Sequence, residues 1–408
     1  CRLLGGGLRL VYVHRAVGHR QSGGTLREAT AAVEGLGVSD VTLYRRCPSA
    51  LPYMQLGAFN TGTPRERVLL RTLLGTGSLS RLASRTARAA ARRPRARRWH
   101  RLLYDCSYWR GVRRAVPNHD TWQRLTRGPT ILMYHACGHP GERASRYLIP
   151  GGRFRRQMQW LKWRRYHVLG LDEFLGYHSE HRLPPARSVV ITFDDGYADN
   201  RAIAYPILRR HGFPATIFVV SGAAGSTNQW DREGELAGRP LSPWSELAEM
   251  RREGTIRIGA HTGSHVALPT VGAERLREEV EGSRGELERN LGVPVLTFAY
   301  PYGEHDADSR EAVERAGYRG ACCSHSGVND PTTNPYLLRR AEVTGSCSLL
   351  RFALALEFGA TRFRVRPATG PSRYAHTAHT AHTAHTAAPA SGPRPNARND
   401  GSPPVMAP

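Results

Sequence analysis

The sequence predicts an α/β fold over residues 130 to about 365, with parallel strands and outer helices arranged as an open sheet or a barrel. One observation is the regular alternation of strand-like and helix-like runs, which is typical of parallel strands covered by helices. The other is the position of two polar motifs, at 192–196 and 261–265, each directly after a strand-like run. In a barrel, functional groups gather on the loops that follow the strand C-termini.

The elements of this region follow from the hydrophobic pattern and from the intervening turn residues. The predicted strands are 130–134, 188–193, 215–220, 256–260, 295–299 and 319–323. The predicted helices are 153–165, 199–211, 244–253, 273–291 and 307–316. Strands and helices therefore follow one another along most of the region.

The rest of the chain divides by composition. Residues 1–80 hold a strand-like run at 8–13 and a helix-like stretch at 26–36, too little to close a domain alone. Residues 81–127 are rich in arginine and are predicted to form a linker or exposed helices. Residues 366–408 carry Ala-His-Thr repeats and few bulky apolar residues, so we expect this tail to be disordered. The remaining segment, 128–365, is the predicted catalytic domain.

The net charge of +24 would ordinarily favour nucleic acid or an anionic membrane surface as a partner. Lys162 is the only lysine, however, and such a bias toward arginine fits GC-rich coding better than selection for phosphate contacts. Nucleic acid is therefore not expected as a partner. The patch at 81–114 mixes arginine with aromatic residues, which leaves contact with a membrane surface open.

The compartment is not fixed by the sequence. No apolar run is long enough for a transmembrane helix, and no signal-like segment follows Cys1, so we interpret the chain as a fragment without its true start. A cytoplasmic or membrane-associated location is favoured. The seven cysteines form no CxxC pair and are predicted to be free, mostly buried thiols.

The two polar motifs predict metal-dependent hydrolysis. Asp194 and Asp195 stand side by side after one strand, and His261 and His265 stand four residues apart after another. One Asp and two His make the three-ligand set of a catalytic zinc site with an open position. The second carboxylate can then serve as general base for water. The alternatives are an Asp-Gly turn and histidines that are merely exposed.

Taken in order, the motifs of this region resemble those of the polysaccharide deacetylase family (carbohydrate esterase family 4, the NodB homology domain). The motifs that carry the resemblance are Met133-Tyr134-His135, Thr192-Phe193-Asp194-Asp195-Gly196, His261-Thr262-Gly263-Ser264-His265 and Phe298-Ala299-Tyr300-Pro301-Tyr302-Gly303. The resemblance implies a distorted (β/α) barrel of the polysaccharide deacetylase type. It also implies removal of N-acetyl groups from amino sugars of a poly- or oligosaccharide, with an N-acetylated glycan as substrate.

The resemblance also assigns roles. Asp195, His261 and His265 would bind a divalent metal, zinc first, with cobalt or another divalent ion as an alternative. Asp194 would be the general base. The backbone N–H of Tyr302 would stabilise the oxyanion.

Further assignments concern the substrate and the catalytic acid. Tyr300, Pro301 and Tyr302 would contact the sugar. The family's late Leu-x-His segment is not visible after residue 340, so His135 is the candidate that protonates the leaving amine, with a structural histidine as the alternative.

Another departure from the family concerns the base. Ala299 stands where the family often has an Arg that orients the base. Arg339 or Arg340 could supply that contact, and the sequence does not choose between them.

Residues 1–80 loosely resemble the C-terminal end of a family 2 glycosyltransferase, through the segment 2–20. This resemblance implies an association with polysaccharide synthesis machinery. Two other functions stay open. The barrel could have lost catalysis and bind glycans or partner proteins, as the missing Leu-x-His segment suggests, or the arginine-rich stretch could bind polyanions or membranes.

Overall fold

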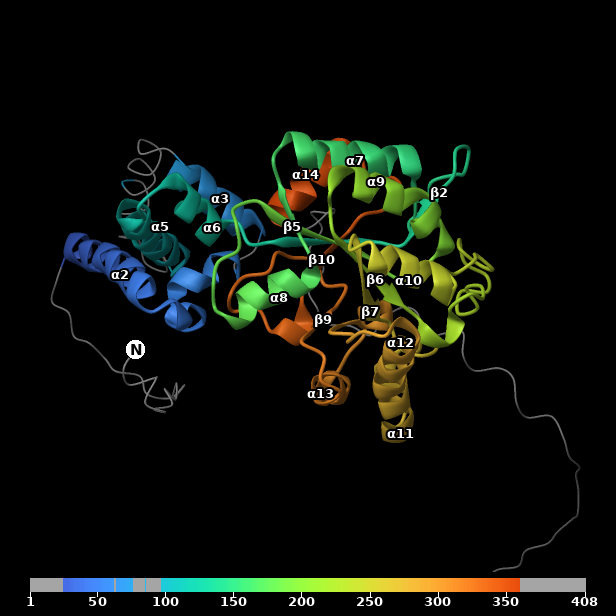
Figure 1. The fold of residues 1–408 in the computed structure, drawn as a ribbon. Coiled ribbons are helices and arrows are strands. Elements are labelled where there is room, and N and C mark those ends of the chain that lie inside the picture. Colours follow the sequence, from blue (N-terminus) through green and yellow to red (C-terminus); the bar gives the residue numbers. More distant parts are fainter. Residues whose placement is uncertain (1–24, 62–63, 76–84, 86–96, 360–408) are drawn as a thin grey trace, which may run out of the picture. The chain divides into compact units, whose positions relative to one another are not determined.

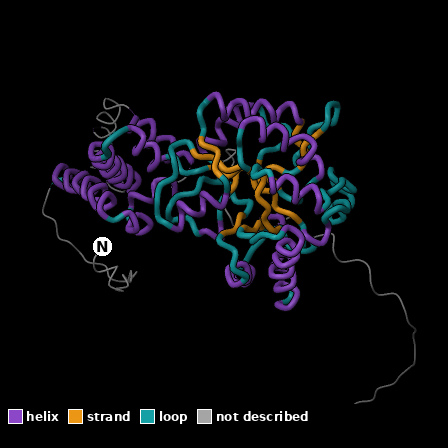
Figure 2. Tube along the Cα trace, in the orientation of Figure 1, coloured by secondary structure: helices purple, strands orange, loops and turns teal. Residues whose placement is uncertain are grey.

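The computed structural model describes residues 25–61, 64–75, 85 and 97–359. The predicted strand at 8–13 and the predicted disordered tail at 366–408 lie outside these residues. The described catalytic region is a sheet of parallel strands surrounded by helices (Figures 1 and 2).

The main sheet is nearly closed. Its strands pair in the order β10-β1-β5-β6-β7-β8-β9, with β4 paired to β5, and every pair is parallel. A parallel bridge between Cys322 and Leu338 joins the end of β9 to the chain just before β10. The strands are β1 (Thr130–Tyr134), β4 (His167–Leu169), β5 (Ser188–Phe193), β6 (Ala215–Val219), β7 (Ile256–Ala260), β8 (Thr297–Ala299), β9 (Gly320–Cys322) and β10 (Arg340–Glu342). The prediction of a (β/α) barrel is confirmed.

The strands are buried on both faces because their side chains alternate between two layers. Val189 and Ile191 of β5 pack into the layer between strands and helices, whereas Val190 joins the cluster inside the barrel. Ile131, Phe218 and other inward side chains complete that inner cluster. The interior is therefore a packed core, which leaves the rim of the barrel for polar side chains.

The helices of the catalytic region confirm the predicted alternation with shifted bounds. The α-helices are α7 (Gly151–Trp163), α8 (Leu171–Ser179), α9 (Tyr205–His211), α10 (Trp244–Arg252), α11 (Ala273–Arg277), α12 (Ser283–Leu291), α13 (Ala307–Arg315) and α14 (Leu349–Phe358). Two π-helical turns interrupt the predicted helices: η3 (Asn200–Ala204) precedes α9, and η6 (Glu278–Gly282) joins α11 to α12. In Figure 1, α7, α9 and α14 lie together on one side of the sheet, and α7 contacts both of the others.

Shorter elements complete this region. The strands β2 (Ala136–Gly138) and β3 (Leu148–Pro150) form a separate parallel pair. The 3-10 turns are η4 (Ser221–Ala223), η5 (Leu268–Thr270), η7 (Pro301–Gly303) and η8 (Pro335–Leu337). Tyr197 also forms an antiparallel bridge with Leu241, which links the end of β5 to the segment before α10.

Residues before the barrel form a helical region with a core of its own. Its elements are α2 (Leu26–Arg46), η1 (Pro48–Tyr53), η2 (Gln55–Thr61), α3 (Pro64–Gly75), α5 (Arg97–Ala115) and α6 (His119–Thr126). The described part of 81–127 holds the helices α5 and α6, as one of the two predicted alternatives has it. Helix α5 is not exposed throughout, however, because Tyr108 and Trp109 are buried against Phe59 and its neighbours. The aromatic residues of α5 therefore differ in exposure: Tyr108 and Trp109 are buried, whereas Trp99 and Tyr104 are exposed.

Helices α2 and α5 approach each other closely at two glycines. A Cβ on Gly37 would lie 2.2 Å from the carbonyl oxygen of Tyr108, and one on Gly111 would lie 2.0 Å from that of Glu34. The Glu34 carboxylate also accepts hydrogen bonds from Arg110 at 3.0 Å and Arg114 at 2.7 Å. Only glycine allows this crossing, since any side chain would push the backbones apart.

Arginines of α3 join the helical region to the end of the barrel domain. Arg67 donates to the Phe358 carbonyl at 3.0 Å, and Arg71 donates to the Glu357 carbonyl at 3.0 Å and the Thr126 carbonyl at 2.5 Å. Burial lowers the pKa of Arg71 to about 10. No helix among the described residues has the length and apolar character needed to span a bilayer.

The cysteines fit the prediction in part. The free cysteines, all buried, are Cys106, Cys137, Cys322, Cys323 and Cys347. Cys47 is different, because it takes part in a disulfide bond. The prediction of free thiols is wrong for this residue.

Candidate active site

The predicted site residues follow the carboxyl ends of neighbouring strands. His135 follows β1, Asp194 and Asp195 follow β5, and His261 follows β7. Backbone hydrogen bonds continue the sheet into these loops: the Asp194 N–H donates to Tyr134 at 2.9 Å, and the His261 N–H donates to Val219 at 2.9 Å. Because parallel strands end at the same rim, the structure brings these residues together.

Asp195, His261 and His265 converge as the sequence predicts. Their candidate ligand atoms all lie within 4.8 Å of one another, and all three residues are buried. Asp195 Oδ1 is 3.4 Å from His261 Nε2 and 3.2 Å from His265 Nε2. Although burial opposes it, the two imidazoles hold the pKa of Asp195 well below its usual range.

The ring of His261 is fixed by the backbone. Its Nδ1 lies 2.7 Å from the Ala299 carbonyl oxygen, and a carbonyl only accepts, so Nδ1 carries a proton. In the neutral ring, Nε2 then has the lone pair on the side of Asp195. Metal-binding histidines commonly donate their other N–H in this way. Burial lowers the pKa of His261, but the Asp195 and Asp194 carboxylates outweigh it and raise that pKa.

These residues fit a divalent metal. Asp195 Oδ1 is buried without a hydrogen-bond partner among the described atoms, although both imidazoles face it at ion-pair distance. His265 Nδ1 is likewise buried and without a partner. A buried carboxylate oxygen and two imidazoles form the donor set of a catalytic zinc site. The orphaned oxygen is explained if it serves as a metal ligand.

Asp194 forms a buried ion pair with Arg340. The guanidinium donates Nη1–H to Oδ1 at 2.6 Å and Nη2–H to Oδ2 at 2.8 Å, and its Nε–H donates to the Cys323 carbonyl at 3.0 Å. Burial alone would raise the pKa of Asp194, but Arg340, followed by His261 and His135, lowers it. Asp194 is thus an ionised carboxylate held in one orientation, as a general base requires.

The structure decides between the two arginines that the sequence left open. Arg340 begins β10 and is 1% exposed, whereas its neighbour Arg339 is exposed. Adjacent side chains of a strand point to opposite faces, so only one of the two can enter the barrel.

His135 lies beside the carboxylates but is less buried than they are. Its imidazole is near enough to lower the pKa of both Asp194 and Asp195. The ring also packs edge-to-face on Tyr147, with centroids 4.8 Å apart. This position is compatible with the predicted acid and does not test that role.

The predicted substrate-binding residues differ in accessibility. Tyr302 is 51% exposed, and its ring packs edge-on against His265 with centroids 4.8 Å apart. Burial and the nearby Asp195 carboxylate raise the pKa of Tyr302 to about 12. Tyr300 and Pro301, in contrast, are buried, so their side chains lie beneath the site and not on its surface. This burial argues against direct contact between these two side chains and a sugar.

Sequence reasoning missed Trp230. Its ring stacks on His265 with centroids 4.5 Å apart and an interplanar angle of 19°. Trp230 lies in the long segment between η4 and α10, where no motif or regular pattern singles it out. Together with Tyr302, it places aromatic rings on two sides of a metal-ligand candidate.

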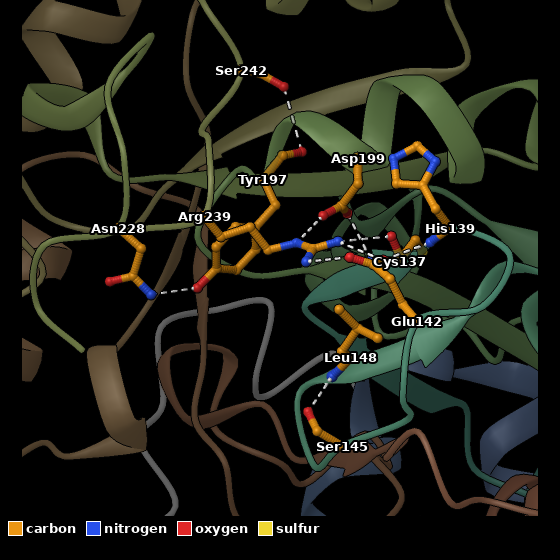
Figure 3. A network of polar contacts seen from close by, with 10 residues as sticks. All are labelled: Cys137, His139, Glu142, Ser145, Leu148, Tyr197, Asp199, Asn228, Arg239 and Ser242. Carbon is orange, nitrogen blue, oxygen red and sulfur yellow. Dashed lines mark hydrogen bonds and ion pairs between the residues drawn. The ribbon is translucent and has the colours of Figure 1, made fainter. Parts of the chain in front are cut away.

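Tyr197 is a second residue that the sequence did not indicate. It is buried, and its hydroxyl accepts a hydrogen bond from Asn228 Nδ2 at 2.8 Å (Figure 3). Burial and the Asp195 carboxylate raise the pKa of Tyr197, so the phenol stays protonated and can donate to that carboxylate. Tyr197 therefore lies where it can support Asp195 as a candidate ligand.

Asp199 forms hydrogen bonds both with β2 and with the segment between η4 and α10 that contains Trp230. Asp199 directly precedes η3, but its side chain makes no capping hydrogen bond. It instead accepts from the Cys137 N–H at 2.6 Å and from Arg239 Nε at 2.5 Å (Figure 3). Arg239 also donates to Glu142 at 3.2 Å. This buried carboxylate is therefore paired with an arginine from another loop.

Comparisons with known proteins agree with this geometry. The model of the family described as polysaccharide deacetylase matches residues 181–321. A relative from Bacillus subtilis (strain 168), named putative polysaccharide deacetylase YxkH, is 27% identical over 227 residues, which cover 56% of this chain and 75% of the relative. The poly-beta-1,6-N-acetyl-D-glucosamine N-deacetylase of Staphylococcus aureus (strain MRSA252) is 29% identical over 202 residues, covering 48% of this chain and 67% of that protein.

One solved structure supports the same family. IcaB from Ammonifex degensii is similar with a TM-score of 0.50 and 25% identity, over 57% of this chain and 97% of that structure. The family match includes Asp194, Asp195, His261 and His265, the residues that the structure brings together. The chain therefore contains a polysaccharide deacetylase domain.

Proposed function

We propose that this protein is a metal-dependent hydrolase that removes N-acetyl groups from amino sugars of a poly- or oligosaccharide. The observation that carries the proposal is the convergence of Asp195, His261 and His265 within 4.8 Å, beside a carboxylate that Arg340 holds ionised. The three converging residues would hold zinc, with cobalt or another divalent ion as an alternative. When bound, such an ion supplies a Lewis acid that polarises the amide carbonyl and acidifies water.

Asp194 supplies the base in this proposal. Its carboxylate accepts a proton from the attacking water, whose oxygen forms a bond to the acetamide carbon. Arg340 keeps Asp194 ionised before the reaction and fixes both carboxylate oxygens. General-base catalysis of this kind contributes about 10²–10⁴-fold in rate.

The remaining steps concern the oxyanion and the leaving group. Charge builds on the carbonyl oxygen after attack, and the Tyr302 backbone N–H would stabilise it by hydrogen bonding. His135 would donate a proton to the amine nitrogen as the C–N bond breaks, which releases acetate and a free amino sugar. The half-exposed Tyr302 ring and the nearby Trp230 offer aromatic surface to a sugar.

The relatives suggest a first substrate. The Staphylococcus aureus relative is named for poly-beta-1,6-N-acetyl-D-glucosamine, so we infer that β-1,6-linked N-acetylglucosamine is the substrate to test first. The resemblance of residues 1–80 to a glycosyltransferase end stays a prediction, and with it the association with polysaccharide synthesis machinery.

The test is acetate release by the full chain from β-1,6-linked and β-1,4-linked N-acetylglucosamine oligomers. Release should require added Zn²⁺ or Co²⁺ and should stop after chelation. Asp194→Asn should lower the rate by about 10²–10⁴-fold while metal binding persists, because the ligands are untouched. Asp172→Asn is the matched control, since Asp172 pairs with Arg257 on the surface.

Two outcomes would contradict the proposal. Full turnover by Asp194→Asn would remove the base from the mechanism. Metal binding without acetate release from any acetylated oligomer would favour the other function, a barrel that binds glycans without cleaving them.

A further inference from the structure

The loop that carries the two metal-binding histidines, residues 261–265, has a backbone that L-residues rarely adopt. Thr262 has φ 66° and His265 has φ 60°. Left-handed backbone is unfavourable for most side chains, and most of all for a β-branched residue such as Thr. Such residues persist only where their surroundings hold them. The contacts that hold this loop therefore also determine where the imidazoles point.

The Glu279 carboxylate accepts hydrogen bonds from two residues of this loop. Its Oε2 accepts from the Gly263 N–H at 2.8 Å and the Ser264 N–H at 2.9 Å, and its Oε1 accepts from the Ser264 hydroxyl at 2.5 Å. The side chain is 2% exposed. A buried carboxylate that receives three hydrogen bonds from two adjacent residues fixes their positions strongly.

The charge of Glu279 is balanced by Arg275. The guanidinium lies 2.6 Å from Glu279 Oε1 and donates to the Ser264 hydroxyl at 3.1 Å. Arg275 therefore contacts both the carboxylate and one of its donors. This pairing makes burial of the acid acceptable, since an unpaired buried charge is costly.

The position of Glu279 in its helix is unusual. It lies in η6, the π-helical turn between α11 and α12. Its neighbour Val280 is fully buried in the main core, which anchors the turn. π-helical turns are rare and occur frequently at functional sites.

The other side of the loop is held by backbone alone. The N–H groups of Ser221 and Gly222 donate to the carbonyls of Thr262 at 3.1 Å and Gly263 at 2.9 Å. These contacts satisfy loop carbonyls, whereas Glu279 satisfies loop N–H groups. Without the carboxylate, the N–H groups of Gly263 and Ser264 would lose their acceptor.

We propose that Glu279 is a positioning residue of the metal site, which holds Gly263 and Ser264 so that His261 and His265 converge on Asp195. This inference rests on the proposed function for the existence of a metal site. Glu279 is not one of the three converging residues, and it acts on the metal only through the loop. Loss of such a supporting group typically weakens metal binding by about 10–100-fold.

The test compares Glu279→Gln with Glu281→Gln in the full chain. Both acids belong to η6, but Glu281 is exposed. Co²⁺ affinity is measured by competition with a coloured chelator, and the visible spectrum of bound Co²⁺ reports ligand geometry. We expect Glu279→Gln to bind Co²⁺ about 10–100-fold more weakly with an altered spectrum, and Glu281→Gln to behave as wild type. Ser264→Ala, which removes one donor, should show a smaller loss.

The outcomes separate this inference from the proposed function. Folded Glu279→Gln with wild-type Co²⁺ affinity and spectrum would overturn the positioning role, whether or not the protein deacetylates. A wild-type protein that binds no Co²⁺ would overturn the metal site itself, and the role of Glu279 with it. If Glu279→Gln does not fold, Ser264→Ala decides, and unchanged affinity in that variant rejects the inference.

Discussion

At the scale of single residues, the site depends on charges that are buried and matched. Arg340 forms a bidentate hydrogen bond with the Asp194 carboxylate, and Asp195 faces two imidazoles. Removing one member of a buried pair leaves the other without compensation, which costs more than the pair itself contributes. Arg340 is therefore expected to support the fold and, in the proposed mechanism, the reaction as well.

Arg340→Met tests this double role. The variant leaves Asp194 buried without its counter-charge, and we expect the free energy of unfolding to fall by about 3–5 kcal/mol. Arg339→Met changes the same residue type one position earlier, at an exposed site, and should stay within about 0.5 kcal/mol of wild type. Urea unfolding followed by circular dichroism measures both. Equal effects of the two substitutions would contradict the assignment of Arg340 as the partner.

The sequence predicted the residues that lie in contiguous motifs and failed for those that do not. Asp194, Asp195, His261 and His265 could be found because each pair follows a strand with a strong apolar pattern. Trp230 could not, because it reaches His265 from a long segment without periodicity.

At the scale of elements, the strands with a strong hydrophobic pattern were predicted, and strands of three residues such as β4 and β10 were missed. β5 and β7 stand where the sequence placed them. β10 has the sequence Arg-Ala-Glu, with no apolar run to mark it, and β4 is equally short. Because β10 was missed, the sequence could not show that Arg340 points into the barrel while Arg339 points to the outside. The choice between the two arginines therefore stayed open.

The crossing of α2 and α5 gives a prediction at this scale. Gly37→Ala would place a methyl group 2.2 Å from the Tyr108 carbonyl oxygen, so the helices must separate, and we expect a loss of about 1–3 kcal/mol. Gly35→Ala, in the same helix with nothing within 4 Å, should instead stabilise by about 0.5–1 kcal/mol through helix propensity. Thermal unfolding of the two variants compares them directly. A stabilised Gly37→Ala would show that the close approach is absent.

At the scale of the whole described molecule, the helical region and the barrel domain share polar contacts. Arg71 reaches the carbonyls of Thr126 and Glu357, and its guanidinium also lies over the Phe59 ring at 5.8 Å. Leu183, from the loop before β5, belongs to the core of the helical region. Such shared contacts favour unfolding of both parts in one transition.

Arg71→Met tests this coupling. The substitution leaves buried carbonyl groups without a donor, at a cost of about 1–3 kcal/mol. We expect the unfolding signals of tryptophan fluorescence, which reports three tryptophans of the helical region and four of the barrel domain, and of circular dichroism to lose their coincidence. Arg27→Met, at an exposed position of α2, should leave the two signals together. Coincident transitions in Arg71→Met would indicate that other contacts suffice.

The closure of the barrel has a consequence for the order in which the protein matures. β10 lies beside β1, so the last strand of the domain docks against the first. During synthesis the aspartates and both histidines leave the ribosome before Arg340 does. Asp194 therefore lacks its counter-charge until the ends of the domain meet. A chain that ends before Arg340 is therefore expected to lack the paired Asp194 carboxylate on which the proposed reaction depends.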